Sequence, residues 1–166
     1  MNNPFKILFL LIFILVNHLA WSQENFREIS LVTNVFEALK EQNEDKLLKC
    51  LPSKEDIAYI IPVLREAQPN SVIPEIDKII ANFKMAATKN FKHIITRGNS
   101  FNITWENMVL EKVEYEANHD PNVQIERGNI TLVCTSGDKK FLIVLKKSYK
   151  IHDTWLLMDR MKFTLL

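Results

Sequence analysis

The spacing of apolar residues changes once along this chain, near Gly98, and this change constrains the fold more than any other feature. Before Gly98 the apolar side chains recur every three or four residues, as on one face of a helix. After Gly98 they alternate with polar side chains, as in strands with one buried face. Helices followed by hairpin-connected strands are typical of the α+β class. We therefore expect N-terminal helices packed on a curved, mostly antiparallel sheet of four strands.

The apolar spacing and capping residues between positions 24 and 62 predict three short helices. Residues 24–42 carry the apolar spacing of an amphipathic helix. Asn43 is suited to cap a second, short helix, because its side-chain oxygen can accept a hydrogen bond from a free N–H of the first turn. Ser53 and Asp56 have the spacing of a capping box and open a third helix. Pro62 is expected to kink this third helix or to end it early.

A long fourth helix is predicted after Pro74, which suits a first helical turn. Its apolar stripe runs from Ile76 to Ile94, and Gly98 is the expected end of the helix.

Four strands are predicted after the long helix, at residues 108–117, 123–135, 141–149 and 155–163. Gly128 marks a bulge or bend in the second strand. Hairpin turns are expected at residues 136–138 and 152–153. One face of the last strand is expected to carry Trp155, Leu157, Asp159, Met161 and Phe163.

The N-terminus has the order of a secretory signal peptide. Lys6 is followed by an unbroken apolar run at residues 7–16, and then by Ala20-Trp21-Ser22. The run is too short to cross a bilayer comfortably. We expect a signal peptide over residues 1–22 and a single α+β, cone-like domain over residues 23–166. An uncleaved N-terminal anchor is the alternative. The mature chain is expected to be exported, periplasmic or secreted, without stable membrane insertion.

Charge and glycine content exclude some classes of function. The 21 Lys and Arg residues nearly balance the 20 Asp and Glu residues. No excess positive charge is present to hold a nucleic acid, so no nucleic-acid partner is expected. The 3 glycines lie too far apart for a phosphate-binding loop. Neither a cofactor nor a metal ion is predicted, since the two cysteines are not accompanied by clustered histidines.

Cys50 and Cys134 have two possible states. In an oxidising compartment an even pair of cysteines can form a disulfide. Both residues also lie in apolar sequence, which suits buried free thiols. The sequence leaves both alternatives open.

The order of elements resembles the nuclear-transport-factor-2-like superfamily of cystatin-like cones, and small exported bacterial proteins within it. The resemblance depends on the opening helix (Val32 to Leu39), the short helix (Asp45 to Leu51) and the closing segment (His152 to Phe163). It spans most of the mature chain but contains no diagnostic motif. The superfamily includes isomerases, dehydratases, transport adaptors and proteins without catalytic activity, so it implies a fold more than a function.

The resemblance also implies a catalytic alternative. Isomerases of the superfamily use a carboxylate inside the cone as a base, and Asp159 is the matching candidate because it interrupts an apolar strand face. Burial on the inner face would suit Asp159 to this role. The other possibility is that Asp159 lies at the rim of the sheet.

We favour a non-catalytic module that binds a small apolar ligand or a protein partner. The candidate binding residues are Tyr59, Trp105, Tyr115 and Trp155. Trp105 and Trp155 are alternatively core residues. A homodimer formed through the sheet is a further possibility.

Overall fold

The computed structural model of the chain describes residues 25–67, 69–70, 72–118, 123 and 125–166. The predicted leader, residues 1–22, lies outside the described residues.

In the described part of the chain, four helices precede the strands, as the apolar spacing predicts. They are α2 (Ser30–Lys40), α3 (Glu44–Leu48), α4 (Lys54–Ala67) and α5 (Ile76–Ser100), and a short 3₁₀ turn follows at Trp105–Asn107. Both predicted helix starts are confirmed. The Asn43 side chain accepts a hydrogen bond from the Lys46 N–H at 3.2 Å. Ser53 and Asp56 each accept from the other's backbone N–H, at 3.2 and 2.8 Å.

Two helices run beyond their expected ends. Pro62 does not end α4 early, since the helix continues through it to Ala67. Pro62 and Ala58 are both exposed, so the Ala58 carbonyl that loses its helical partner can bind water instead. Gly98 does not end α5, which runs on to Ser100. The left-handed residue that follows the helix is Asn102, with a φ of 59°.

Gly98 instead provides space for Trp105. A Cβ atom at position 98 would lie 2.2 Å from the Trp105 ring. The Trp105 indole N–H donates to the Asn99 side chain at 2.9 Å, and its ring lies edge-on to Phe141 and Phe163. The glycine is therefore required by a close contact between the helix backbone and a buried indole.

The strands are β1 (Val109–Ala117), β2 (Arg127–Ser136), β3 (Lys139–Ile151), β4 (Thr154–Leu157) and β5 (Met161–Leu165). All pairings are antiparallel, in the order β1-β2-β3-β4, and β5 also pairs with β3. The α+β class is thus confirmed, as is the register shift beside Gly128 in β2.

The sheet has five strands because the predicted last strand is broken. Strand β5 pairs with the first half of β3 and β4 with the second half, so both lie on the same edge of β3. Between these halves, Lys147 has a φ of 50° and β3 bulges. The break at residues 158–160 lies opposite this bulge: the Lys146 N–H donates to the Arg160 carbonyl at 3.1 Å, and the Met158 N–H to the Lys147 carbonyl at 3.3 Å.

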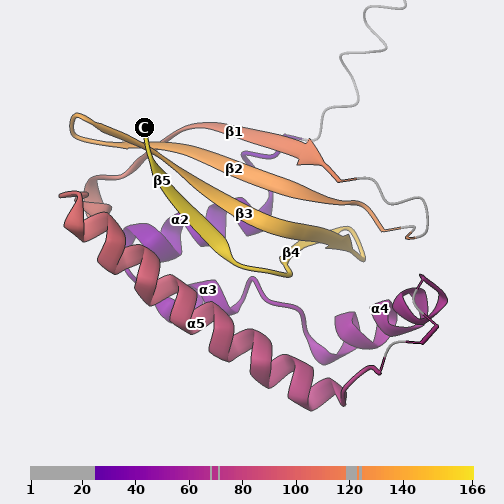
Figure 1. Cartoon of the computed structure of the whole chain (residues 1–166). Helices are drawn as coiled ribbons and strands as arrows, with labels where there is room; N and C mark the ends of the chain where they lie inside the picture. The colour runs from indigo at the N-terminus through magenta and orange to yellow at the C-terminus, as the bar shows by residue number, and fades with distance from the viewer. Residues whose placement is uncertain (1–24, 68, 71, 119–122, 124) are drawn as a thin grey trace, which may run out of the picture.

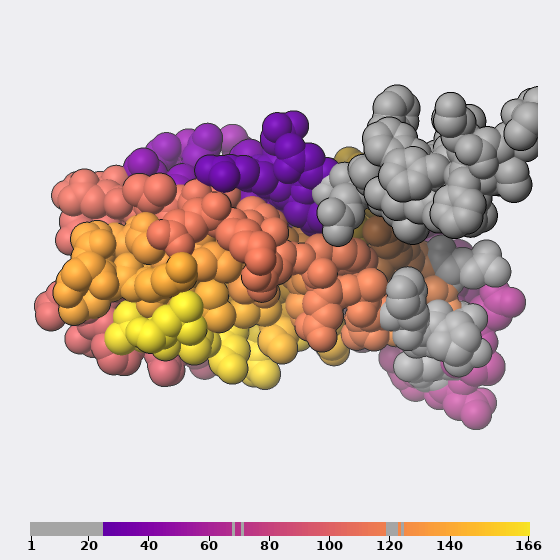
Figure 2. Space-filling model, turned by 90° about the horizontal axis from the view of Figure 1, so that it is seen from above, coloured from indigo at the N-terminus to yellow at the C-terminus, as the bar shows by residue number. Residues whose placement is uncertain are grey.

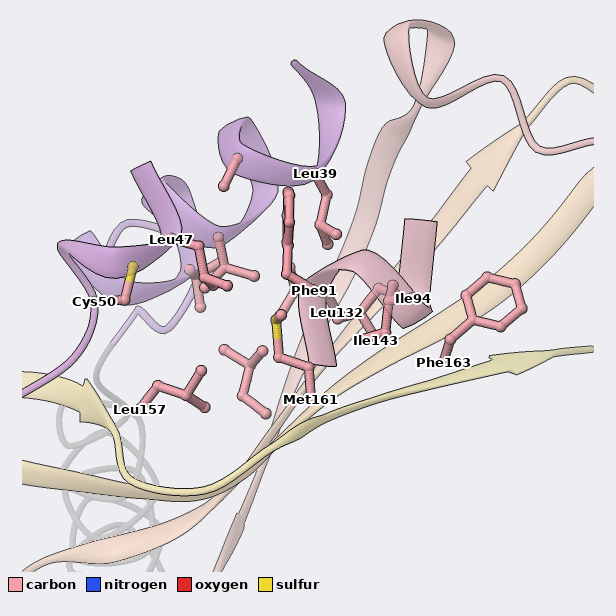
Figure 3. Packing of buried hydrophobic residues seen from close by; sticks show 14 of the residues in the cluster. Leu39, Leu47, Cys50, Phe91, Ile94, Leu132, Ile143, Leu157, Met161 and Phe163 are labelled. Atoms are coloured by element: carbon pink, nitrogen blue, oxygen red, sulfur yellow. The ribbon is translucent and has the colours of Figure 1, made fainter. Parts of the chain in front are cut away.

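The helices cover one face of the sheet. Figure 1 shows α2, α3 and α5 beneath the strands, and α4 beyond the end at which β4 lies. Seen from above, the residues of the strands, coloured from salmon to yellow, occupy most of the described part of the opposite face (Figure 2). Side chains from α2, α3, α5 and the strands meet in the main core, as Figure 3 shows for Leu39, Leu47, Phe91, Leu132, Ile143 and Phe163. A smaller core joins α4 to the end of β3 and to β4.

Candidate functional site

A cavity of about 350 Å³ lies between the N-terminal half of α5 and the bend that joins β4 to β5. This volume is at the small end of the range of ligand pockets, and an apolar lining with a few polar groups is typical of them. The lining residues are Leu51, Ile79, Asn82, Phe83, Ala86, Ala87, Met158, Asp159 and Arg160.

Helix α5 forms one wall of the cavity with small and large side chains. Ile79, Phe83, Ala86 and Ala87 are spaced three, four and seven residues apart, so they lie on adjacent parts of one helix surface. The two alanines leave space that a larger side chain would fill. Ala86 is exposed, whereas Ala87 is buried, so the alanines span the wall from its opening to the core.

The opposite wall is positioned by a side-chain clamp between α5 and β5. The Met161 N–H donates to Asn90 Oδ1 at 2.7 Å, and Asn90 Nδ2 donates to the Met161 carbonyl at 3.0 Å. Asn90 thereby satisfies both backbone groups of Met161 as a neighbouring strand would. Because Met161 directly follows Arg160, the clamp fixes the bend beside the first half of α5.

The polar groups lie at the opening of the cavity. Asp159, Arg160 and Asn82 are all exposed, and they provide a carboxylate, a guanidinium and an amide next to the apolar lining. The site can therefore hold an apolar body and orient a polar end.

A second hollow lies between the first turns of α4 and the start of α5. It is lined by Lys54, Glu55, Ala58, Glu75, Ile76 and Asp77. Lys54 forms an ion pair with Asp77. With four charged residues in its lining, this hollow offers little to an apolar ligand.

The structure places Trp105 and Trp155 in the core, in accordance with the alternative reading of these residues. Each is 2% exposed and belongs to the main core. Neither lines the cavity, so the prediction of a binding role for them finds no support in their positions.

Tyr59 and Tyr115 also lie away from the cavity. Tyr59, on α4, is half exposed, and its ring lies 4.4 Å from the His152 ring on the β3–β4 turn. Tyr115 stacks on Phe26 at 4.4 Å and its hydroxyl donates to the Arg127 carbonyl at 3.2 Å. The four aromatic candidates are not brought together with the lining residues.

Asp159 lines the cavity but is not on a strand. It is exposed, in the bend between β4 and β5. Of the two possibilities for Asp159, burial on an inner strand face does not apply, because the bulge at Lys147 breaks the strand and its alternation before Asp159. The catalytic alternative depended on that burial.

Cys50 and Cys134 are free thiols, 2% and 0% exposed. The two cysteines lie beside different positions of β3. Cys50 is next to Leu157, whose N–H donates to the Cys50 carbonyl and which pairs with Ser148 of β3. Cys134 pairs with Phe141 of β3. Positions 141 and 148 of β3 are seven residues apart, or roughly 23 Å along a strand. A disulfide needs Cα atoms within about 7 Å, so the two thiols are too far apart to form one in this fold.

Burial raises the pKa of each thiol from 9.0 to about 12, and the negative charge of Glu111 further raises the pKa of Cys134.

Sequence reasoning missed most of the lining. It singled out Asp159 for another role and predicted an apolar stripe from Ile76 to Ile94, but it gave no binding role to Asn82, Ala86 or Arg160. The available signal for the cavity was the pair Ala86 and Ala87 on the long helix, because their small side chains leave space at the helix surface.

Two surveys of the described residues give no metal or membrane site. The parts of the chain that the structure describes contain no cluster of three or more His, Cys, Asp or Glu side chains able to hold a metal ion. None of the helices there combines the length and the apolar character that a membrane span requires. In comparisons with known proteins, no family model, no curated protein and no solved structure matches this chain.

Proposed function

We propose that this protein is a non-catalytic binding module that takes a small, largely apolar ligand into the cavity between α5 and the β4–β5 bend. The observation that carries the proposal is the composition of the lining, in which six apolar side chains surround the space and three polar ones lie at its opening. An apolar lining with a few polar groups suits the binding of a largely apolar molecule whose polar end lies at the opening.

The cavity suits a ligand better than the open face of the sheet does. That face carries ion pairs between Lys112 and Glu114 and between Lys140 and Glu111, both at 2.8 Å. On the same face Val133 is 7% exposed, and its neighbours Leu142 and Val144 on β3 are partly buried. An apolar ligand would therefore meet charged or largely covered side chains there, whereas the cavity is lined by six apolar side chains.

We also propose that ligand binding takes place outside the cytoplasm and that the domain belongs among the nuclear-transport-factor-2-like cones. The leader pattern of residues 1–22 supports export. Helices followed by antiparallel strands support the family resemblance.

Substitution of Ala86 by Trp tests the proposed site. Ala86 is exposed at the cavity wall, so an indole placed there fills the cavity without displacing the core. Binding of 1-decanol to the full chain is measured by isothermal titration calorimetry. Ala86→Trp should weaken it at least tenfold.

The matched control is Ala58→Trp. Ala58 is also an exposed helical alanine, but it lines the second hollow on α4. It should leave 1-decanol affinity unchanged. Equal affinities of the two variants and the unmodified chain would refute the proposed site.

A further inference from the structure

We infer that the ligand is a single-chain amphiphile with an anionic head group, whose apolar chain lies against α5 and whose head group binds Arg160. This inference rests on the proposed function, and it adds the chemical class of the ligand. It depends on three observations: the position of Arg160, the charges of α5 and the size of the cavity.

Arg160 lies at the opening of the cavity with its guanidinium uncommitted. Within the described residues this side chain takes part in no ion pair and no side-chain hydrogen bond, including with its neighbour Asp159. Its backbone carbonyl is held by the Lys146 N–H, and the next residue is held by Asn90. The backbone is thus fixed while the guanidinium remains able to donate two parallel hydrogen bonds to a carboxylate or a phosphate.

Helix α5 is basic in a chain that is nearly neutral. It carries Lys78, Lys84, Lys89, Lys92 and Arg97 against Asp77 alone. Asp77 is paired with Lys54 on α4, and Lys92 is paired with Glu44 on α3. The whole chain, by contrast, has 21 basic and 20 acidic residues. The positive charge is therefore concentrated on the helix that forms the cavity wall.

Three of these lysines are helical neighbours of residues that line the cavity. Lys78 precedes Asn82 by four residues, Lys84 precedes Ala87 by three and Lys89 follows Ala86 by three. All three are exposed. They add positive charge beside the cavity wall, which favours an anion over a cation, although Asp159 contributes one carboxylate at the opening.

The volume of the cavity suits an apolar chain of about ten carbons. At about 30 Å³ for each non-hydrogen atom, the volume that a water molecule occupies in the liquid, 350 Å³ accommodates about a dozen atoms. Decanoate, with ten carbons and two oxygens, has this size. Its alkyl chain matches the apolar lining, and its carboxylate reaches the opening where Arg160 lies.

The experiment compares three ten-carbon probes that differ in the head group. Decanoate, 1-decanol and decyltrimethylammonium are titrated into the full chain at pH 7.5 and low salt. We expect decanoate to bind about tenfold more tightly than 1-decanol, since its head group adds a charge-assisted hydrogen-bonded pair. The cation should bind most weakly. Higher salt should reduce the preference for decanoate.

Arg160→Gln identifies the residue responsible. It should weaken binding of decanoate about tenfold and binding of 1-decanol much less, so that the two affinities become similar. The matched control is Arg65→Gln, because Arg65 is an exposed arginine on α4 that does not line the cavity. It should change neither affinity. An unchanged ratio of decanoate to 1-decanol affinity in Arg160→Gln overturns the inference.

The outcomes separate this inference from the proposed function. If Ala86→Trp weakens all the probes that bind but the three head groups bind equally, the cavity is the site and the anionic class is wrong. If decanoate binds and Ala86→Trp has no effect, the proposed function fails. Binding of none of the three probes overturns both.

Discussion

Replacing Gly98 with alanine tests how closely α5 packs on Trp105. In most helices this change stabilises the fold by about 1 kcal/mol, since alanine is the better helix former. Here the new Cβ would lie 2.2 Å from Trp105 Cζ2 and 2.9 Å from Cε2. Because the two effects have opposite signs, the measured free energy of unfolding decides which one is larger.

The packing around Trp105 indicates that the steric effect is larger. The ring is 2% exposed and Phe141 and Phe163 lie edge-on to it, so it has no free space into which to move. Overpacking of this kind costs about 1–3 kcal/mol, and a 2.2 Å contact belongs at the upper end. A displaced ring also loses its hydrogen bond to Asn99, worth about 1 kcal/mol. After subtraction of the gain in helix propensity, we expect Gly98→Ala to destabilise the fold by about 2–3 kcal/mol.

Urea unfolding followed by circular dichroism measures this difference directly. A double-mutant cycle with Trp105→Phe identifies its cause, because phenylalanine lacks the ring atoms that the new Cβ would meet. In that background Gly98→Ala should be neutral or stabilising by up to about 1 kcal/mol, which gives a coupling of about 3 kcal/mol. Stabilisation by Gly98→Ala alone, or the same cost in both backgrounds, would refute the reasoning.

Three further predictions concern other parts of the fold. Asn90→Leu should lower the free energy of unfolding by about 2 kcal/mol, because it removes two hydrogen bonds to Met161, and urea unfolding that shows no loss would contradict the clamp. Burial raises the pKa of Cys50 and Cys134 from 9.0 to about 12, so above pH 9 the unfolded chain loses thiol protons that the folded chain retains. Stability should therefore fall between pH 9 and 12 by about 1.4 kcal/mol per pH unit for each thiol, and a cysteine-to-alanine variant should lose that share of the slope; parallel pH profiles would argue against it. Gly137, with a φ of 60° and no atom near its Cβ position, should cost about 1–2 kcal/mol when changed to Ala and less when changed to Asn, so equal unfolding midpoints would exclude backbone strain.

Local signals predicted the elements of this fold well. The cap at Asn43, the capping box at Ser53 and the stripe along α5 depend on neighbours within four residues, and the structure contains all three. The hairpin turn at residues 152–153 was also predicted from local sequence, and in the structure both residues have positive φ. Fold class could be predicted because it follows from such local periodicity.

The limits of the elements and the candidate site depend on contacts between distant segments. Nothing near Asp159 in the sequence shows that the strand breaks there, because the break lies opposite a bulge in β3. The role of Gly98 depends on Trp105, which returns to the helix only after the chain turns at Asn102. The cavity requires Asn90 to hold β5 from a helix 71 residues earlier in the chain.

The position of the cavity follows from how the interior of the fold is filled. In an α+β domain the space between the long helix and the sheet is an obvious place for a ligand, but here Trp105, Phe141 and Phe163 belong to the main core in that space. A ligand bound there would have to displace buried aromatic side chains, at several kcal/mol for each. Beyond this core, α5 extends toward its N-terminus with alanines at positions 86 and 87, and the broken strand turns away from the core just opposite them. An unbroken fourth strand would have continued its pairing along β3, so the bulge at Lys147 both excludes Asp159 from the interior and brings Arg160 to the opening of an apolar space.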